Sequence, residues 1–225
     1  MSPIMRRLIH LPLSPFCRKI RLVLAEKKLQ VDLIEEPVWE RRVELIRLNP
    51  AAMVPILKNE NLILSESNAI FEFLEEKYPK PALLPESLLD RAEARRINFW
   101  FDDKFHREVT SRLLYERVNK KLAKSGEPDS AIIKSGMKNF KFHIEYMDWL
   151  LQKRRWLAGD KLTIADFSAA AHFSSLDYIG TVDWEMSVNI KDWYVKLKSR
   201  PAFRPLLADL VPGFSPPPYY SDLDF

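Results

Sequence analysis

The sequence predicts an α/β domain followed by an all-α domain. Short apolar segments typical of strands alternate with helical patterns over residues 1–80. A proline-containing linker follows, and beyond it apolar residues recur at helical spacing over long stretches, with no strand pattern. We therefore expect an α/β domain over residues 1–80, an all-helical domain over residues 86–208, and an extended tail, rich in proline, acidic and aromatic residues, over residues 209–225.

The first domain is predicted to run in the order βαβ, then αββα. Its expected helices begin at Ser14, Glu40 and Ser67, and the last ends at Tyr78, before a proline. Its expected strands, of which the last two form a hairpin, are Arg7–His10, Val31–Ile34, Val54–Leu57 and Leu62–Leu64.

The second domain shows helical patterns at about residues 87–123, 129–153, 163–178 and 188–199, with a short helix after Pro201. Thr163 and Asp166 have the spacing of a capping box, which we interpret as structural. The first helix carries a wide aromatic band, formed by Phe99, Trp100, Phe101 and Phe105. From Pro212 onward the prolines prevent a helix, so we expect an extended terminus that lies away from the core.

Composition excludes several classes of function. The chain has 225 residues, of which 47% are hydrophobic and 29% charged, as is typical of a globular protein. No apolar run has the length of a membrane span or signal peptide, so we expect a cytoplasmic protein that is not inserted into a membrane. The formal charge is +4, but basic and acidic residues alternate, so we expect no nucleic-acid partner. The four histidines lack paired metal-ligand spacing, so we expect no metal site.

A candidate reactive site lies where the first strand leads into the first helix. Ser14 is a predicted N-cap, Pro15 the first helical residue and Cys17 the third. The partial positive charge of a helix N-terminus stabilises a thiolate, either that of Cys17 or that of a ligand beside the Ser14 hydroxyl. The alternative interpretations are that Ser14 is only a cap and that Cys17 is a small buried hydrophobe. Cys17 is the only cysteine, which excludes dithiol exchange and an internal disulfide.

These features together resemble the cytosolic glutathione S-transferase superfamily. The resemblance rests on the βαβ-αββα half, on Val54-Pro55 before a strand, on residues 65–70 opening a helix, and on residues 162–167 in the helical half. It implies a thioredoxin-like N-terminal domain, a helical C-terminal domain and a homodimer, which the aromatic band also favours. It further implies glutathione as a possible co-substrate, contacted by Val54, Pro55, Glu66 and Ser67, with Ser14 or Cys17 in the catalytic role.

Two positions depart from the glutathione-binding pattern of this superfamily. Its glutathione-binding members commonly carry a glycine and a polar Lys, Gln or Arg just before the Val-Pro pair, whereas this chain has Ala52 and Met53. A methionine side chain is a weak hydrogen-bond partner for a peptide ligand. We therefore expect glutathione to bind weakly or not at all, and we expect no required cofactor.

Three segments, residues 37–42, residues 191–201 and the end of the tail at residues 216–225, resemble an alphaproteobacterial branch of the superfamily. The members of that branch are dimers that bind the tubulin-like FtsZ polymer and regulate cell division. This resemblance implies an adaptor that acts at the division site through FtsZ or other division proteins. The alternative is a transferase that conjugates or exchanges glutathione with small electrophiles. The residues expected to contact the partner are Trp39, Arg41, Arg42, Tyr219, Tyr220, Asp222, Asp224 and Phe225.

Overall fold

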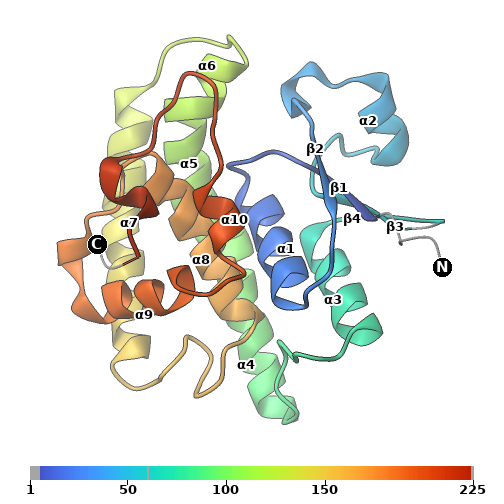
Figure 1. The fold of residues 1–225 in the computed structure, drawn as a ribbon. Helices are drawn as coiled ribbons and strands as arrows, with labels where there is room; N and C mark the ends of the chain where they lie inside the picture. The colour runs from blue at the N-terminus through green and yellow to red at the C-terminus, as the bar shows by residue number, and fades with distance from the viewer. Residues whose placement is uncertain (1–5, 60, 224–225) are drawn as a thin grey trace. The chain divides into compact units, whose positions relative to one another are not determined.

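The chain divides into two compact units, residues 1–82 and residues 83–225. The computed structural model describes residues 6–59 and 61–223 (Figure 1). Each unit has the architecture that the sequence predicts: the first is a mixed sheet with helices, and the second is helical. None of the helices in the described part of the chain is long and apolar enough to cross a membrane.

The first unit contains a four-stranded sheet in the order β2-β1-β3-β4. β1 pairs in parallel with β2 and antiparallel with β3, which forms a hairpin with β4. Helices α1 and α3 pack beside each other (Figure 1). The elements are β1 (Arg6–His10), α1 (Pro15–Glu26), β2 (Asp32–Glu35), the 3-10 turn η1 (Val38–Glu40), α2 (Val43–Leu48), β3 (Ile56–Asn59), β4 (Leu62–Ser65) and α3 (Ser67–Lys77).

The predicted order βαβ-αββα is therefore confirmed, with small shifts at the ends of elements. The third strand begins at Ile56 and not at Val54, because Val54 and Pro55 belong to the loop before it. The helix predicted from Glu40 begins at Val43 and is preceded by the separate turn η1. Arg41 lies between the two with φ +46°, a conformation that interrupts a helix.

In the second unit, the predicted first helix is continuous from residue 88 to residue 122, but it changes between α-helical and π-helical hydrogen bonding. This helix comprises α4 (Leu88–Phe99), η2 (Trp100–Thr110), α5 (Ser111–Leu114), η3 (Tyr115–Asn119) and α6 (Lys120–Leu122). The predicted aromatic band does not stay on one surface. Phe101 and Phe105 are buried in the core, whereas Phe99 is 63% exposed.

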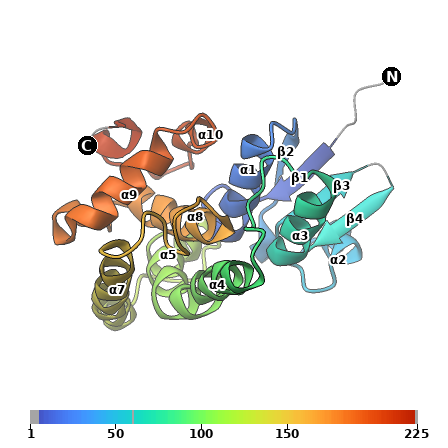
Figure 2. The same ribbon diagram turned by 90° about the horizontal axis from the view of Figure 1, so that it is seen from below.

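The remaining helices of this unit surround α8. They are α7 (Ser130–Leu151), α8 (Ile164–Tyr178), the 3-10 turn η4 (Trp184–Met186), α9 (Val188–Lys198), α10 (Arg204–Leu207) and the 3-10 turn η5 (Pro218–Ser221). Every residue of α8 is buried, as expected for a helix enclosed on all sides. Figure 2 shows it among α4, α5, α7 and α9.

The start of α8 carries the capping box that the sequence predicts. Asp166 accepts hydrogen bonds from the backbone N–H groups of Thr163 (3.0 Å) and Leu157 (2.9 Å) and from the indole N–H of Trp193 (3.0 Å). Its carboxylate therefore joins the preceding loop and α9 to the first turn of α8. Burial raises the pKa of Asp166 to about 6, and these donors oppose that rise.

The prediction of an extended tail that lies away from the core is wrong. The chain after α10 folds back and ends its described part in η5, where Tyr220 is only 1% exposed. The Tyr178 hydroxyl accepts a hydrogen bond from the Val211 N–H (2.9 Å) and donates one to the Phe214 carbonyl (3.0 Å). The prolines do prevent an α-helix here, but the aromatic side chains supply enough apolar area to pack the tail against the helices.

Candidate functional site

Four segments of the first unit meet at one edge of its sheet. The register pairs Ile9 near the end of β1 with Ile56 at the start of β3, and Ile56 with Ser65 at the end of β4. Parallel pairing with β1 places the end of β2 at the same edge. The loops and helix starts next to these strand ends contain the predicted residues of the first unit. The residues predicted to contact glutathione are Ser14, Val54, Pro55, Glu66 and Ser67, and those predicted to contact a partner are Trp39, Arg41 and Arg42. The topology thus brings both predicted sets of the first unit to one edge.

Ser14 caps α1, as the sequence predicts. Its hydroxyl oxygen accepts a hydrogen bond from the Cys17 N–H at 3.4 Å, and Pro15 is the first helical residue. The Ser14 side chain is half-buried. A ligand thiolate that reached this point could accept the hydroxyl proton beside the positive end of the helix.

Cys17 has the surroundings of a core residue. It is fully buried and packs in a cluster with Leu45, Ala52 and Val54. Burial raises the pKa of the thiol to about 11, even though the Ser14 side chain and the Leu11 backbone make hydrogen bonds that lower it. The desolvation of a thiolate therefore outweighs these hydrogen bonds here. Of the two interpretations of Cys17, the structure favours the small buried hydrophobe over the catalytic thiol.

The loop before β3 is organised by Asn49, a residue that the sequence analysis did not select. The Asn49 amide donates to the Met53 carbonyl (3.0 Å), and its side-chain oxygen accepts from the Ala51 N–H (3.1 Å). Ala52 has φ +53°, and the Val54-Pro55 peptide bond is cis. The Asn49-Pro50 pair in the sequence indicates a turn here, but it does not indicate that the Asn49 side chain holds the loop.

The residues around this loop fit glutathione only in part. Met53 is 54% exposed, and its thioether is a weak hydrogen-bond partner for a peptide. Its carbonyl already accepts a hydrogen bond from Asn49. Ser14 and the start of α3 offer suitable groups, but position 53 does not.

The start of α3 presents Glu66 and Ser67 as the sequence predicts. Glu66 precedes the helix with φ +71° and an exposed side chain, and Ser67 is the first helical residue and is 6% exposed. Glu66 makes no side-chain cap, so its carboxylate is available to a cation such as an ammonium group. Next to Ser67, in the same first turn of α3, Asn68 accepts a hydrogen bond from the Lys19 ammonium at 3.0 Å.

The three predicted residues in the segment after β2 differ in their exposure and in their partners. Trp39 is half-buried, whereas Arg41 is exposed and forms no ion pair within the described residues. Arg42 is also exposed, but its Nε–H and Nη2–H groups donate to the two oxygens of the Glu36 carboxylate, and this pairing raises the pKa of Arg42. Arg41 and the exposed part of Trp39 are therefore the groups of this segment that a partner can reach directly. The pairing through Glu36 was not apparent from the sequence.

The predicted tail residues belong to the second unit and have different environments. Tyr220 is buried, Tyr219 is half-buried and Asp222 is exposed. Asp224 and Phe225 lie outside the described residues. The Lys198 ammonium donates to the Tyr219 carbonyl at 3.3 Å, and burial lowers the pKa of Lys198 to about 8, against the attraction of Asp177 and Asp222. Lys198, which the sequence analysis did not select, thus anchors the tail.

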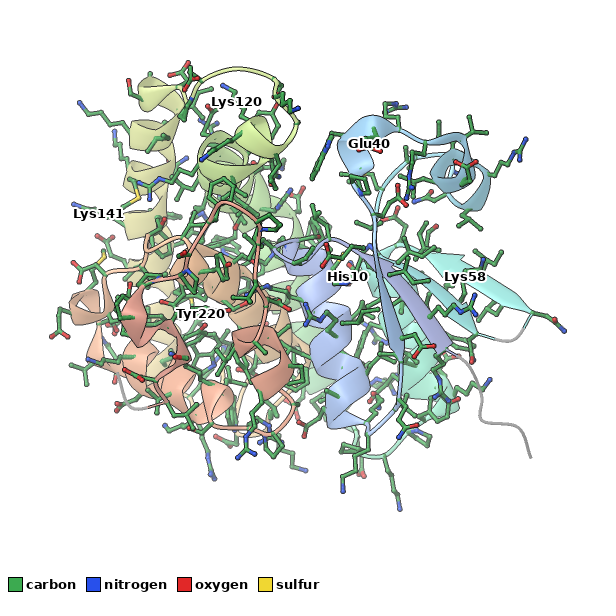
Figure 3. The ribbon with its side chains drawn as sticks, turned by 45° about the horizontal axis from the view of Figure 1, so that its top comes forward. His10, Glu40, Lys58, Lys120, Lys141 and Tyr220 are labelled. Atoms are coloured by element: carbon green, nitrogen blue, oxygen red, sulfur yellow. The ribbon has the colours of Figure 1, made fainter. Side chains whose placement is uncertain are left out.

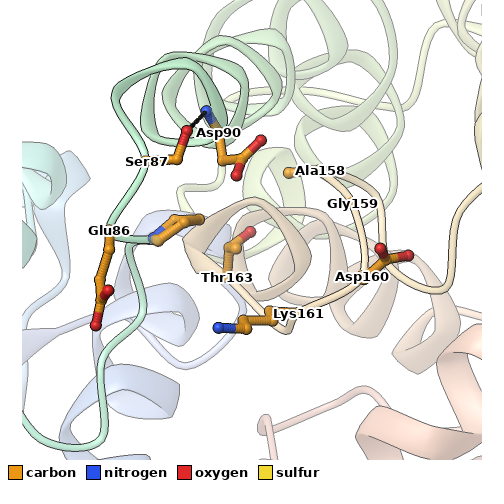
Figure 4. Close-up of a pocket in the computed structure, with 9 residues that line it drawn as sticks. Glu86, Ser87, Asp90, Ala158, Gly159, Asp160, Lys161 and Thr163 are labelled. Atoms are coloured by element: carbon orange, nitrogen blue, oxygen red, sulfur yellow. Dashed lines mark hydrogen bonds between the residues drawn. The ribbon is translucent and has the colours of Figure 1, made fainter.

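A separate cavity of about 400 Å³ lies in the second unit, at the start of α4 (Figure 4). Ser87, which lines this cavity, is the N-cap of α4, and its hydroxyl oxygen accepts a hydrogen bond from the Asp90 N–H. Asp160, Lys161 and Thr163 line the other side. None of the predicted site residues lines this cavity. Within the described residues, no three His, Cys, Asp or Glu side chains are grouped so that they could hold a metal ion.

Comparison with known proteins assigns both units to one family. Residues 8–82 match the N-terminal domain of glutathione S-transferase, and residues 107–208 match its C-terminal domain. The chain is similar to "FtsZ-localized protein A" of Caulobacter vibrioides, with 46% identity over 224 residues that cover 98% of each protein. It is also similar to the Escherichia coli K12 protein "Glutathione S-transferase GstB", with 29% identity over 195 residues, 83% of this chain and 90% of that one.

Two solved structures share the fold over nearly the whole chain. A glutathione S-transferase from Rhodospirillum rubrum is 47% identical with a TM-score of 0.95, covering 98% of this chain and 100% of that one. The structure "FzlA from C. crescentus" is 45% identical with a TM-score of 0.95, covering 99% of this chain and 100% of that one. The chain therefore belongs to the glutathione S-transferase family.

Proposed function

We propose that this protein is a glutathione S-transferase-like adaptor that binds FtsZ and regulates cell division at the division site. The observation that carries the proposal is its 46% identity, over 98% of both chains, to a protein named for its localisation with FtsZ. The buried Cys17 and the exposed Met53 support a role that does not require glutathione chemistry.

The first proposed contact is the segment after β2. Arg41 is exposed and forms no ion pair within the described residues, and Trp39 beside it is half-buried. An aromatic side chain next to a free guanidinium is a combination enriched at the centres of protein interfaces. We infer that these two residues contact an acidic and partly apolar surface of the polymer.

The second proposed contact is the end of the tail. Because Tyr220 and Lys198 hold η5 against the helices, the neighbouring Tyr219 and Asp222 are presented from a fixed base. A partner would then bind without first ordering the whole tail, which lowers the entropic cost of association. The tail in this proposal is a docked surface and not a flexible arm.

We also propose that the protein is a homodimer through an aromatic face on α4, η2 and α7. Trp100 and Tyr146 lie 4.6 Å apart between ring centroids, and Tyr146 stacks near Trp149 at 6.3 Å. Phe99, Phe142 and Trp149 are 63%, 54% and 49% exposed. An exposed aromatic surface of this kind is typical of a protein–protein interface. Two copies would offer a polymer two binding surfaces and thus raise the effective affinity.

A transferase activity is the second candidate, and one observation favours it. The half-buried Ser14 hydroxyl lies at a helix start, at the same sheet edge as Val54-Pro55 and Glu66. In this case Ser14 would donate to the glutathione thiolate and stabilise it for attack on an electrophile. Calorimetric titration with glutathione tests this candidate: binding at tens of micromolar or tighter that the Ser14→Ala variant weakens would support it.

A fluorescent fusion in cells tests the adaptor proposal. We expect the fusion to form a band at midcell that coincides with FtsZ, and an Arg41→Glu fusion at the same level to be diffuse. The Ser14→Ala fusion is the matched control, and we expect it to localise normally. Diffuse wild-type fluorescence in cells with intact FtsZ rings would overturn the proposal.

A further inference from the structure

Two cavities adjoin each other in the second unit, where the chain turns between α6 and α7. The first has a volume of about 470 Å³ and is lined by Arg117, Lys120, Lys121 and Lys124, together with the loop from Gly126 to Pro128. Figure 3 shows Lys120 at this end of the helical unit. The second has a volume of about 350 Å³ and lies between the end of α8 and the returning tail. Arg117 lines both cavities.

The first cavity has an excess of positive charge. Lys120 is paired with Glu116 at 2.6 Å. Arg117 donates only to the neutral Thr181 hydroxyl at 2.9 Å, and neither Lys121 nor Lys124 forms an ion pair within the described residues. Glu127 is the single acidic residue in the lining. Three cations therefore face this cavity without an acidic partner, and a carboxylate ligand would reduce their mutual repulsion.

The second cavity supplies an apolar surface next to these cations. Its lining includes Val118, Ile179, Phe214 and Pro217. The Lys121 ammonium lies 5.0 Å from the centroid of the Phe214 ring, so a lysine of the first cavity also contacts the lining of the second. The two cavities thus form one site with a cationic half and an apolar half, joined by Arg117 and by the Lys121–Phe214 contact.

We propose that this site binds an acidic peptide segment of a partner protein that carries an aromatic or aliphatic side chain. The carboxylates of the segment contact Arg117, Lys121 and Lys124, and its apolar side chain enters the cavity beside Ile179 and Phe214. A free inorganic anion would use only the cationic half and a neutral apolar ligand only the other half, so the pairing of the halves favours a peptide. The site lies in the helical unit and does not depend on the proposed FtsZ-binding residues.

Selection from a random peptide library displayed on phage tests the inference, with the full chain as bait. We expect the enriched peptides to carry a net negative charge and at least one large apolar residue. Synthetic copies of the enriched peptides are then titrated against variants by fluorescence anisotropy. The double variant Lys121→Glu, Lys124→Glu should weaken binding about tenfold or more, since it replaces attraction by repulsion. Phe214→Ala should weaken binding at every salt concentration, whereas the loss from charge reversal should shrink as salt rises.

The matched control is the double variant Lys138→Glu, Lys141→Glu, which makes the same charge change on exposed lysines of α7. It should bind the peptides like the wild type. All variants are compared only where their melting temperatures agree with that of the wild type. Enriched peptides without negative charge, no enrichment at all, or equal loss in the control would overturn the inference. Tighter binding of a single-stranded oligonucleotide than of the peptides, lost in the same variants, would also overturn it and would assign the site to nucleic acid.

Discussion

The Tyr220 hydroxyl donates a hydrogen bond of 3.2 Å to the carbonyl oxygen of Leu206, the last residue but one of α10. The Tyr220 ring also packs edge-on against Tyr178, with 5.3 Å between their centroids. These contacts join the end of the described chain to the interior of the helical unit. The tail is therefore part of the folded structure.

We predict that Tyr220→Ala lowers the free energy of unfolding by about 3 kcal/mol, because it empties a buried aromatic site and leaves the Leu206 carbonyl without this partner. Removal of residues 216–225 should destabilise at least as much. Tyr219→Ala is the matched control and should cost about 1 kcal/mol or less, because Tyr219 is only half-buried. Urea denaturation checks all three. An unchanged midpoint for Tyr220→Ala would show that the tail is not packed in solution.

A second prediction concerns Cys17. Because burial raises its pKa to about 11, we expect the native thiol to react with iodoacetamide at neutral pH far more slowly than the same thiol in urea. Between pH 9 and 11 the thiol of the unfolded chain ionises while the thiol of the folded chain remains protonated. The contribution of Cys17 to the free energy of unfolding therefore falls as pH rises through that window. Cys17→Ala should lack this slope. Rapid alkylation of the native protein, measured by mass spectrometry, would contradict the buried assignment.

A third prediction concerns Asp166. Asp166→Asn should cost about 2–4 kcal/mol, because an amide can accept from only part of the donor set that surrounds the carboxylate, and hydrogen bonds to charged groups are worth about 1.5–3 kcal/mol each. Asp160→Asn, in the exposed loop nearby, should change stability by less than about 0.5 kcal/mol.

The same carboxyl gives a pH dependence. Its pKa rises from 3.8 to about 6 on folding, so the folded state retains a proton that the unfolded state has released. The contribution of Asp166 to stability therefore falls as pH rises from about 4 to about 6. Asp166→Asn should remove that part of the slope in a series of melting curves. An identical slope in the variant would show that Asp166 does not titrate in this range.

Local patterns in the sequence predicted the local structure well. Ser14 and Thr163 were recognisable as helix caps because a cap depends on residues within one turn. The burial of Tyr220 was not predictable in this way, since it depends on Tyr178, Lys198 and Leu206, which are distant in sequence. The four aromatic residues were taken as one band for a related reason: Phe101 and Phe105 pack against His172 and Phe173 of α8, and spacing alone did not separate them from the exposed Phe99.

The sequence suggested which residues of the first unit could contact glutathione, but not that they lie near one edge of the sheet. The register brings positions 14, 54, 55, 66 and 67 near that edge, and their role in glutathione binding stays a prediction. That Arg42 is held by Glu36 while Arg41 is not could be learned only from the structure, because the two adjacent arginines have the same acidic residues nearby in the sequence and the pairing is a matter of side-chain geometry.

A fourth prediction tests the proposed dimer. Trp149→Glu should place a charge in the aromatic face and convert the dimer to a monomer of 26.4 kDa in sedimentation equilibrium. Asp192→Lys, an exposed change on α9, is the control and should leave the dimer intact. A wild-type protein that sediments as a monomer at micromolar concentration would contradict the proposal.

The central claim is that this chain binds FtsZ, and co-sedimentation with purified FtsZ polymerised by GTP tests it most directly. We predict that the wild-type chain pellets with the polymer in a saturable manner, that Arg41→Glu and Trp39→Ala remain in the supernatant, and that Ser14→Ala and the exposed control Arg155→Glu pellet like the wild type. Circular dichroism of Trp39→Ala must first show a native fold, because its side chain is half-buried. A wild-type chain that stays in the supernatant with fully polymerised FtsZ would contradict the account.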